Sequence, residues 1–336
     1  MWFIYAIISF CCWGLADLFY KKSSDANDKQ SHLKIAVWVG LVMGVCALIL
    51  LPFAESGRSL LHISNLIKYA PASLSYIISM VIGYAGMRYL ELSVASPVQN
   101  ASGALSAIFM AIWFACTSDN FLASISDETG FTFGHAQGLA LWNNMIIVCG
   151  MLLIFVGVIA LAVVEQRLSN AEQTLPMEER KYKLGALALL FPILYCLFDT
   201  IGTAADGIIL DENTGLGLGE IDVIILYGLT FLLFGLCAWI YLWVRNKKPY
   251  NPFTRKEIAN KGVAACCEEA GQIVYVYAMA AKPMLAAPII ASYCILSVLL
   301  SRIFLKEKLV KKQYVTVFMV ILGIVLLGIS EGIGEM

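Results

Sequence analysis

The chain alternates between long apolar runs and short polar stretches. Ten runs are close to the twenty apolar residues that an α-helix needs to cross the hydrocarbon core of a bilayer. The predicted spans are Trp2–Tyr20, Leu33–Phe53, Tyr69–Leu90, Val94–Thr117, Leu139–Val164, Leu184–Ile208, Val223–Val244, Gly262–Ala281, Leu285–Leu305 and Tyr314–Ile329. Because backbone groups inside a membrane must satisfy their own hydrogen bonds, we predict an all-α integral membrane protein of ten transmembrane helices.

Composition supports this fold class and excludes others. Of the 336 residues, 60% are hydrophobic and 14% are charged, and the mean hydropathy is +0.78. No soluble domain of this length has that composition. The first run, from Trp2, has neither a basic leader nor a cleavage signal, so we predict a membrane span and not a removable signal peptide. The net charge of -1 offers no basic field for nucleic acid, which we exclude as a partner.

Cysteine and histidine give no sign of a metal site or a cofactor. All ten cysteines lie within or at the ends of apolar runs, where they are expected to pack as small hydrophobic side chains without disulfides. The three histidines, His32, His62 and His135, are widely spaced in predicted loops. We therefore expect no bound metal and no cofactor.

The basic residues predict how the chain crosses the membrane. All but Arg58, Lys68 and Lys282 of the 23 Lys and Arg residues lie in the loops after the odd-numbered spans. By the positive-inside rule those loops face the cytoplasm, so both termini are expected outside. The expected location is the plasma (inner) membrane.

The two halves of the chain repeat one pattern. At one constant offset Tyr84 falls on Tyr275, Pro97 on Pro288, and the residues around each proline also match. We predict a first five-helix repeat over 1–164, a polar cytoplasmic linker over 165–183 and a second repeat over 184–336. Five spans per repeat make the two repeats run in opposite senses through the bilayer. Inverted repeats are typical of alternating-access transporters that bind substrate near mid-membrane, between the repeats.

Several short motifs resemble a known family. They are Trp13-Gly14 in the first span, Ala95-Ser96-Pro97 in the fourth, Ala287-Pro288 in the ninth and Leu305-Lys306-Glu307-Lys308-Leu309 at its end. With the five-plus-five spans, they resemble the drug/metabolite transporter superfamily of the EamA type. The resemblance implies a secondary transporter whose first, third, fourth, sixth, eighth and ninth spans line a central cavity. The residues Cys116-Thr117-Ser118-Asp119-Asn120, at the end of the fourth span, depart from the acidic-basic pair of the ninth.

The eighth predicted span carries two adjacent carboxyls near its middle. At helical spacing Glu268, Gln272 and Tyr275 lie on one stripe, while Glu269 lies about 100° round the helix. Ionised groups are costly at this depth, so the pair is expected to face protein or a water-filled cavity and to serve proton coupling. The alternative is that both glutamates are protonated and only hold helices together.

Other polar residues are expected to join the same cavity. Tyr195 and Asp199 lie one turn apart in the sixth span, although Asp199 is as consistent with a buried structural hydrogen bond. The remaining candidates for substrate binding are Trp13, Gln99, Asn100 and Tyr293, the last three close after the prolines of the fourth and ninth spans. Asp17 is expected to pair with Lys21, four residues on, as an interfacial anchor.

The charged residues in the predicted spans indicate the class of substrate. Glu268 and Glu269 fall on isoleucines in the first repeat, and no Lys or Arg lies near the middle of any span. A cavity with carboxylates and aromatic rings suits an organic cation or a zwitterion, with protons and the bilayer as further partners. The alternative is proton-coupled transport of neutral metabolites such as amino acids or sugars, recognised by Gln99, Asn100 and Gln272. A membrane enzyme or receptor is the third class, but no nucleophile, metal set or cofactor motif supports it.

Overall fold

A computed structural model describes residues 1–24, 28–90, 92–117, 120–134, 138–173, 188, 190–211, 215–306 and 310–334. All regular structure in these residues is helical. The longer helices are α1 (Trp2–Ser23), α2 (Ser31–Leu50), α3 (Ile63–Gly86), α4 (Leu92–Gln99), α5 (Ser102–Thr117), α6 (Phe121–Thr129), α7 (Leu139–Gln173), α8 (Leu190–Ile209), α9 (Glu220–Asn246), α11 (Val263–Ala281), α12 (Pro283–Ala291), α13 (Cys294–Leu300) and α14 (Lys311–Gly334). Short segments are the 3-10 helices η1 (Leu51–Phe53) and η2 (Gly57–Leu61), the one-turn α10 (Arg255–Glu257), and the π-helical turns η4 (Ile258–Gly262) and η5 (Ser301–Leu305).

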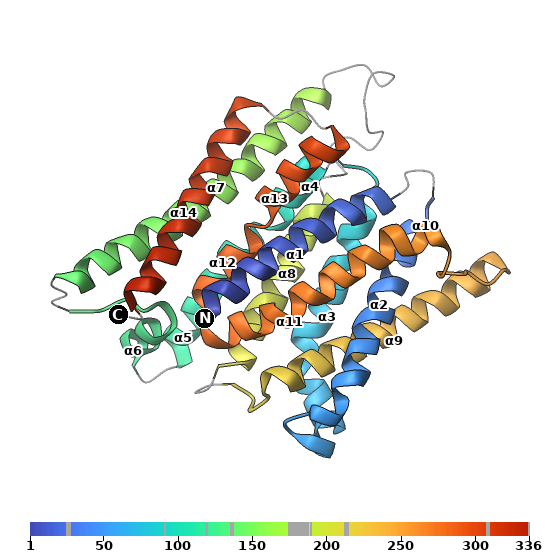
Figure 1. The fold of residues 1–336 in the computed structure, drawn as a ribbon, viewed down its shortest axis with the longest axis horizontal. Helices are drawn as coiled ribbons and strands as arrows, with labels where there is room; N and C mark the ends of the chain where they lie inside the picture. Colours follow the sequence, from blue (N-terminus) through green and yellow to red (C-terminus); the bar gives the residue numbers. More distant parts are fainter. Residues whose placement is uncertain are drawn as a thin grey trace.

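The membrane-protein fold class is confirmed. Within the described residues, nine helical stretches are long and apolar enough to cross a bilayer, and they correspond to nine of the ten predicted spans. The tenth is α11, which falls outside this set because Glu268, Glu269 and Gln272 lower its hydropathy. It is still a continuous helix of 19 residues, and it packs lengthwise against α1 in the middle of the bundle (Figure 1).

Two of the spans are broken helices. The fourth is divided into α4 and α5 by a turn at Asn100 and Ala101, and the ninth into α12 and α13 by a turn at Ser292 and Tyr293. In each case the proline lies inside the first segment, close before the break. Proline removes one backbone donor and its ring crowds the turn before it, so each span is weakened next to its break.

The helices pack in pairs that join the two halves of the chain. The most extensive pairs are α2 with α9, α7 with α14, α1 with α11, α3 with α8, and α5 with α12. In Figure 1, α7 and α14 form one flank of the molecule, α2 and α9 form the other, and α1, α11 and α12 lie between them. The termini lie at the same end of the bundle, where the Met1 amino group is 2.7 Å from the Glu331 carboxylate.

Glycine sets the spacing of the α2–α9 pair. A Cβ atom placed on Gly40 would lie 2.5 Å from the backbone oxygen of Phe231 and 2.8 Å from the Cα of Gly235. Backbone atoms cannot move aside as a flexible side chain can. Small residues at such crossings let helices approach closely in a membrane, where lipid is as apolar as the side chains and packing supplies the attraction.

Some expectations lie outside the described residues. Helix α7 continues to Gln173, so the first part of the predicted linker 165–183 prolongs the fifth span, and the rest of the linker is not described. The structure likewise does not describe Glu307-Lys308-Leu309, Ser118-Asp119 or His135. The division into 1–164, 165–183 and 184–336 stays a prediction.

Candidate functional site

A cavity lies in the middle of the bundle, between the broken helices and the pairs α1–α11 and α3–α8. It is narrow: the centres of water-sized molecules can occupy a volume of about 40 Å³ within it. The polar and aromatic residues that line it are Trp13, Asp17, Tyr20, Tyr76, Tyr84, Gln99, Asn100, Ser102, Tyr195, Asp199, Thr203, Tyr227, Glu268, Gln272, Tyr275 and Tyr293. Nine of the ten candidate site residues are therefore brought together, and the exception is Glu269.

Helix α11 supplies one wall through the stripe that its spacing predicts. Glu268, Gln272 and Tyr275 all line the cavity and are all buried. Both amide atoms of Gln272 are buried without a hydrogen-bond partner in the described part of the chain. An unpaired buried amide costs about 1–3 kcal/mol, so this side chain is suited to a ligand or to ordered water.

Glu269 faces a different way. It is 7% exposed, as buried as Glu268, but it lies beside Cys46 of α2 and outside the cavity lining. The rotation of about 100° between consecutive helical residues turns it toward α2 while Glu268 faces the cavity. The expectation that Glu269 faces the same cavity as Glu268 is therefore corrected.

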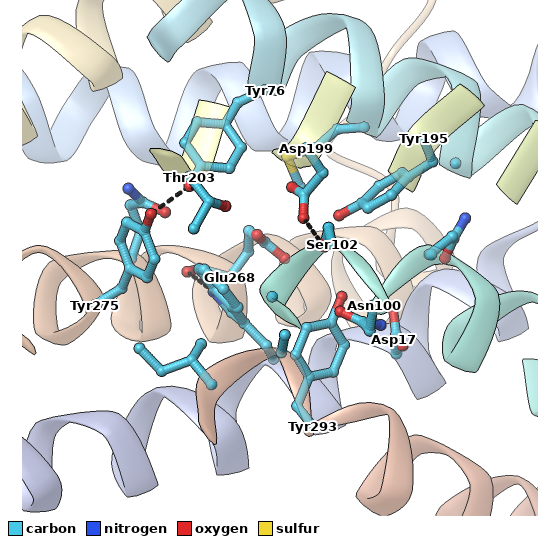
Figure 2. A pocket seen from close by; sticks show the side chains of 18 of the residues that line it. Asp17, Tyr76, Asn100, Ser102, Tyr195, Asp199, Thr203, Glu268, Tyr275 and Tyr293 are labelled. Carbon is cyan, nitrogen blue, oxygen red and sulfur yellow. Dashed lines mark hydrogen bonds between the residues drawn. The ribbon is translucent and has the colours of Figure 1, made fainter. Parts of the chain in front are cut away.

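Helix α8 supplies the opposite wall. Tyr195, Asp199 and Thr203 follow one another at helical spacing and all line the cavity, as Figure 2 shows. Ser102 Oγ, from the start of α5 beyond the break, donates a hydrogen bond of 2.6 Å to Asp199 Oδ2. The broken fourth span thus brings a donor to the acid of the sixth.

Helix α1 contributes an indole that contacts α11 and the break in the ninth span. Trp13 Nε1 donates a hydrogen bond of 3.2 Å to the backbone oxygen of Glu268. Its ring lies 5.1 Å from the ring of Tyr275 and 5.8 Å from that of Tyr293, measured between centroids. A Cβ at Gly271 would lie 2.4 Å from the indole Cδ1, so this approach requires glycine. The aromatic faces are held together beside the Glu268 carboxyl.

Asp17 lies in the cavity wall and is not an interfacial anchor. It is 6% exposed, and its Oδ2 accepts hydrogen bonds from Ser96 Oγ at 2.6 Å and from Ser297 Oγ at 2.8 Å. Lys21 instead donates to the backbone oxygens of Met87 and Leu90. The expected ion pair with Lys21 is wrong, because the Asp17 carboxyl is hydrogen-bonded to serines of the fourth and ninth spans and Lys21 is bonded elsewhere.

The residues near the proline breaks line the cavity as expected. Asn100 donates from Nδ2 to the backbone oxygen of Ser96 at 2.8 Å, which satisfies part of the broken helix. Gln99 is buried, and its Nε2 has no partner among the described residues. Tyr293 lies at the second break, and its ring contacts that of Trp13 edge-on.

The site carries acid without base. Three carboxyls line it, those of Asp17, Asp199 and Glu268. None of the described lining residues is a lysine, arginine or histidine, and no ion pair with these three acids is found in the described part of the chain. No group of three or more His, Cys, Asp or Glu residues there is arranged to hold a metal ion. A cation entering the cavity would meet unpaired carboxyls and tyrosine faces.

Sequence reasoning missed four of the tyrosines in the wall, Tyr20, Tyr76, Tyr84 and Tyr227. It also missed Asp206, which lies just behind the wall and accepts a hydrogen bond of 3.0 Å from Tyr69. The spacing of Asp199, Thr203 and Asp206 places them on one face of α8, and this signal was present in the sequence. A signal was also present for two of the four tyrosines, because Tyr76 and Tyr84 lie eight residues apart on one face of α3 and Tyr84 falls on Tyr275 in the repeat.

Comparison with known proteins finds a family model and a solved structure similar to part or all of the chain. Residues 213–329, from just before α9 into α14, match the EamA-like transporter family. No curated protein matches the chain. One crystal structure matches at 11% identity with a TM-score of 0.57, covering 97% of this chain and 95% of that chain, so the fold is shared over almost the whole length.

Proposed function

We propose that this chain, whose residues 213–329 belong to the EamA-like transporter family, carries a small organic cation or zwitterion through the cavity described above. The family match over residues 213–329 agrees with the resemblance that the motifs suggested. It supports a membrane transporter of small molecules, and not an enzyme, as the function of the chain. The substrate class, the coupling ion and the transport cycle are proposals.

The observation that carries the substrate class is the set of three carboxyls in an aromatic cavity without a lining cation. A cation bound there would gain a charge partner in Glu268 and aromatic faces from Trp13, Tyr275 and Tyr293. Each cation–π contact contributes about 0.5–2 kcal/mol, depending on how dry the site is. An anionic substrate would meet only repulsion from the ionised carboxyls, so phosphates and dicarboxylates are disfavoured.

Glu268 is also the proposed site of proton coupling. Its carboxyl is nearly buried and has no described cation beside it, so ionisation is costly until a cationic substrate arrives. A proton and a substrate would then compete for one carboxylate, and binding of one would release the other. Glu269 lies outside the cavity lining and is not required for this exchange.

Alternating access is the proposed cycle. Helix α1 packs against α11, so the first span of one half meets the third span of the other. Helix α3 packs against α8, which is the reciprocal contact that a two-fold repeat predicts. The substrate cavity lies between the halves, where such transporters rock. Both termini lie at one end of the bundle. From the positive-inside rule, we propose that this end faces the outer side of the plasma (inner) membrane.

A second candidate is proton-coupled transport of a neutral metabolite. It is favoured by the unpartnered amides of Gln99 and Gln272, which are suited to hydroxyl or amide groups of a sugar or an amino acid. Glu268 would then bind protons only.

A thermal-shift panel on the purified protein separates the two candidates. The probes are a primary monoamine, a quaternary ammonium, a neutral amino acid, a neutral sugar and a dicarboxylate. A ligand at one hundred times its Kd adds about 2.7 kcal/mol to the stability, which is readily measured. Stabilisation by the amines alone, or by the amines and the amino acid, supports the first proposal. Stabilisation by the sugar or by the dicarboxylate without the amines refutes it, and the sugar result supports the second candidate.

Uptake of the stabilising probe into proteoliposomes then tests coupling. A pH gradient of either sign is imposed at fixed membrane potential, and accumulation is expected only when protons can flow in exchange. Accumulation that is indifferent to the pH gradient would contradict the proposed role of Glu268.

A further inference from the structure

A further buried acid, Asp206, lies behind the wall of the cavity. Asp206 is 0% exposed and does not line the cavity. Tyr69 donates a hydrogen bond of 3.0 Å to its Oδ1, and its Oδ2 is buried with no hydrogen-bond partner in the described part of the chain. A buried oxygen without a partner is costly, so Asp206 calls for a role beyond its bond to Tyr69.

A layer of hydroxyl groups separates Asp206 from the cavity. Tyr76 and Tyr275 both line the cavity, and their hydroxyls are hydrogen-bonded to each other. Tyr76 is also bonded to Thr203 Oγ1 at 3.1 Å, and the hydroxyls of Tyr76 and Tyr275 face the Asp206 carboxyl from the cavity side. Figure 2 shows Tyr76 and Tyr275 directed toward each other beside Thr203. Every one of these groups can both accept and donate a proton.

No described cation balances a charge on Asp206. The titratable groups that face it are Tyr69 and Tyr76 from α3, Tyr227 from α9, Tyr275 from α11 and Asp199 from its own helix. Around the adjacent Gly207, the nearest side chains from α5 and α12 are Met110 and Pro283, which do not titrate. A carboxylate buried without a cation costs several kcal/mol, whereas the protonated acid avoids most of that cost.

We propose that Asp206 is a second proton-binding site, separate from Glu268, and that it exchanges its proton with the cavity through the hydroxyls of Tyr275 and Tyr76. When a proton moves from the cavity to Asp206, a proton from cavity water bonds to the Tyr275 oxygen while that hydroxyl passes its own proton to Tyr76. Tyr76 in turn passes its proton to the Asp206 carboxylate. Only O–H bonds form and break, and the two hydroxyls end as they began. The site then holds one proton more than Glu268 alone could hold.

Infrared difference spectroscopy of the purified full-length protein tests this without any substrate, so the outcome does not depend on the proposed function. A protonated carboxyl gives a C=O band that is distinct from the bands of carboxylate, and deuterium shifts it. At neutral pH the parent protein is expected to show, besides the bands of any other protonated carboxyls, a band that disappears in Asp206→Asn. The same band is expected to remain in the matched variant Asp199→Asn, which makes the same change two helical turns away in the cavity wall. If Asp206→Asn loses a carboxylate band and not a protonated-carboxyl band, Asp206 is ionised in the parent and the proposal is overturned.

The relay is tested by transfer into deuterated buffer. In Tyr275→Phe the deuterium shift of the Asp206 band is expected to be at least tenfold slower than in the parent. The control is Tyr277→Phe, on the same helix but outside the cavity lining, which is expected to exchange at the parental rate. Equal rates in all three proteins would refute the relay.

A further variant keeps the test valid if Asp206→Asn does not fold. Tyr69→Phe removes the hydroxyl that is bonded to Oδ1 and is expected to shift the frequency of the Asp206 band without abolishing it. An unshifted band would assign the signal to another carboxyl and overturn the proposal. Thermal unfolding of each variant establishes that the compared proteins are folded.

Discussion

Replacing Glu268 by glutamine removes a charge from the cavity and leaves its shape almost unchanged. The chain offers an unusually close control, since Glu269→Gln makes the same change at the next residue, equally buried, but outside the cavity lining. Two unit charges 4 Å apart attract by about 4 kcal/mol at an effective dielectric constant of 20. Asp17 and Asp199 remain in the cavity and supply part of the attraction. We therefore expect Glu268→Gln to weaken binding of a cationic ligand roughly 10²- to 10³-fold, since each 1.4 kcal/mol is a factor of ten.

The assay is calorimetric titration of the purified proteins with the amine that gives the largest thermal shift, over a series of pH values. In the parent and in Glu269→Gln, affinity is expected to fall as the pH is lowered, because protons compete for the Glu268 carboxylate. In Glu268→Gln the remaining weak binding is expected to lose most of this pH dependence. The reasoning is refuted if the two variants lose affinity equally, because a charge outside the cavity would then matter as much as one inside it. It is also refuted if Glu268→Gln binds the amine as the parent does.

Two further predictions concern stability, measured by thermal unfolding. Gly40→Ala forces a Cβ to within 2.5 Å of the α9 backbone and is expected to destabilise the protein by about 1–3 kcal/mol, whereas Gly332→Ala, where the added Cβ meets nothing within 4 Å, should be neutral or slightly stabilising; equal melting temperatures for the two would contradict the packing argument. Partial burial acts to raise the pKa of Asp28, but hydrogen bonds from Lys34 at 2.6 Å and from a backbone amide outweigh it and lower the pKa below 3.8. This stabilisation is therefore present above about pH 4 and is lost as the pH falls through the folded-state pKa, so Asp28→Asn should destabilise by about 0.2–1 kcal/mol at pH 7 and by less at lower pH; a pH-independent difference would show that the ion pair is not the cause.

The sequence alone determined the features that depend on one helix at a time. A bilayer accepts only segments that satisfy their own backbone hydrogen bonds, so apolar runs of the right length predict the spans, and a proline lies in each of the two spans that are broken. Helical geometry likewise fixes which residues share a stripe. The spacing of Glu268, Gln272 and Tyr275 is therefore sufficient to assign them to one cavity wall.

Which helix each polar face packs against depends on the tertiary structure. Spacing places Glu269 about 100° from Glu268, but the position of α2 determines that it meets Cys46 and not the cavity. Asp17 has a lysine at the favourable local spacing, yet serines from two distant spans take its carboxyl. The tyrosines around Asp206 come from helices far apart in the chain. Angular position on a helix is a local property, whereas the partner on the facing helix depends on how all the helices pack, and the apolar pattern of a membrane segment carries little information about that packing.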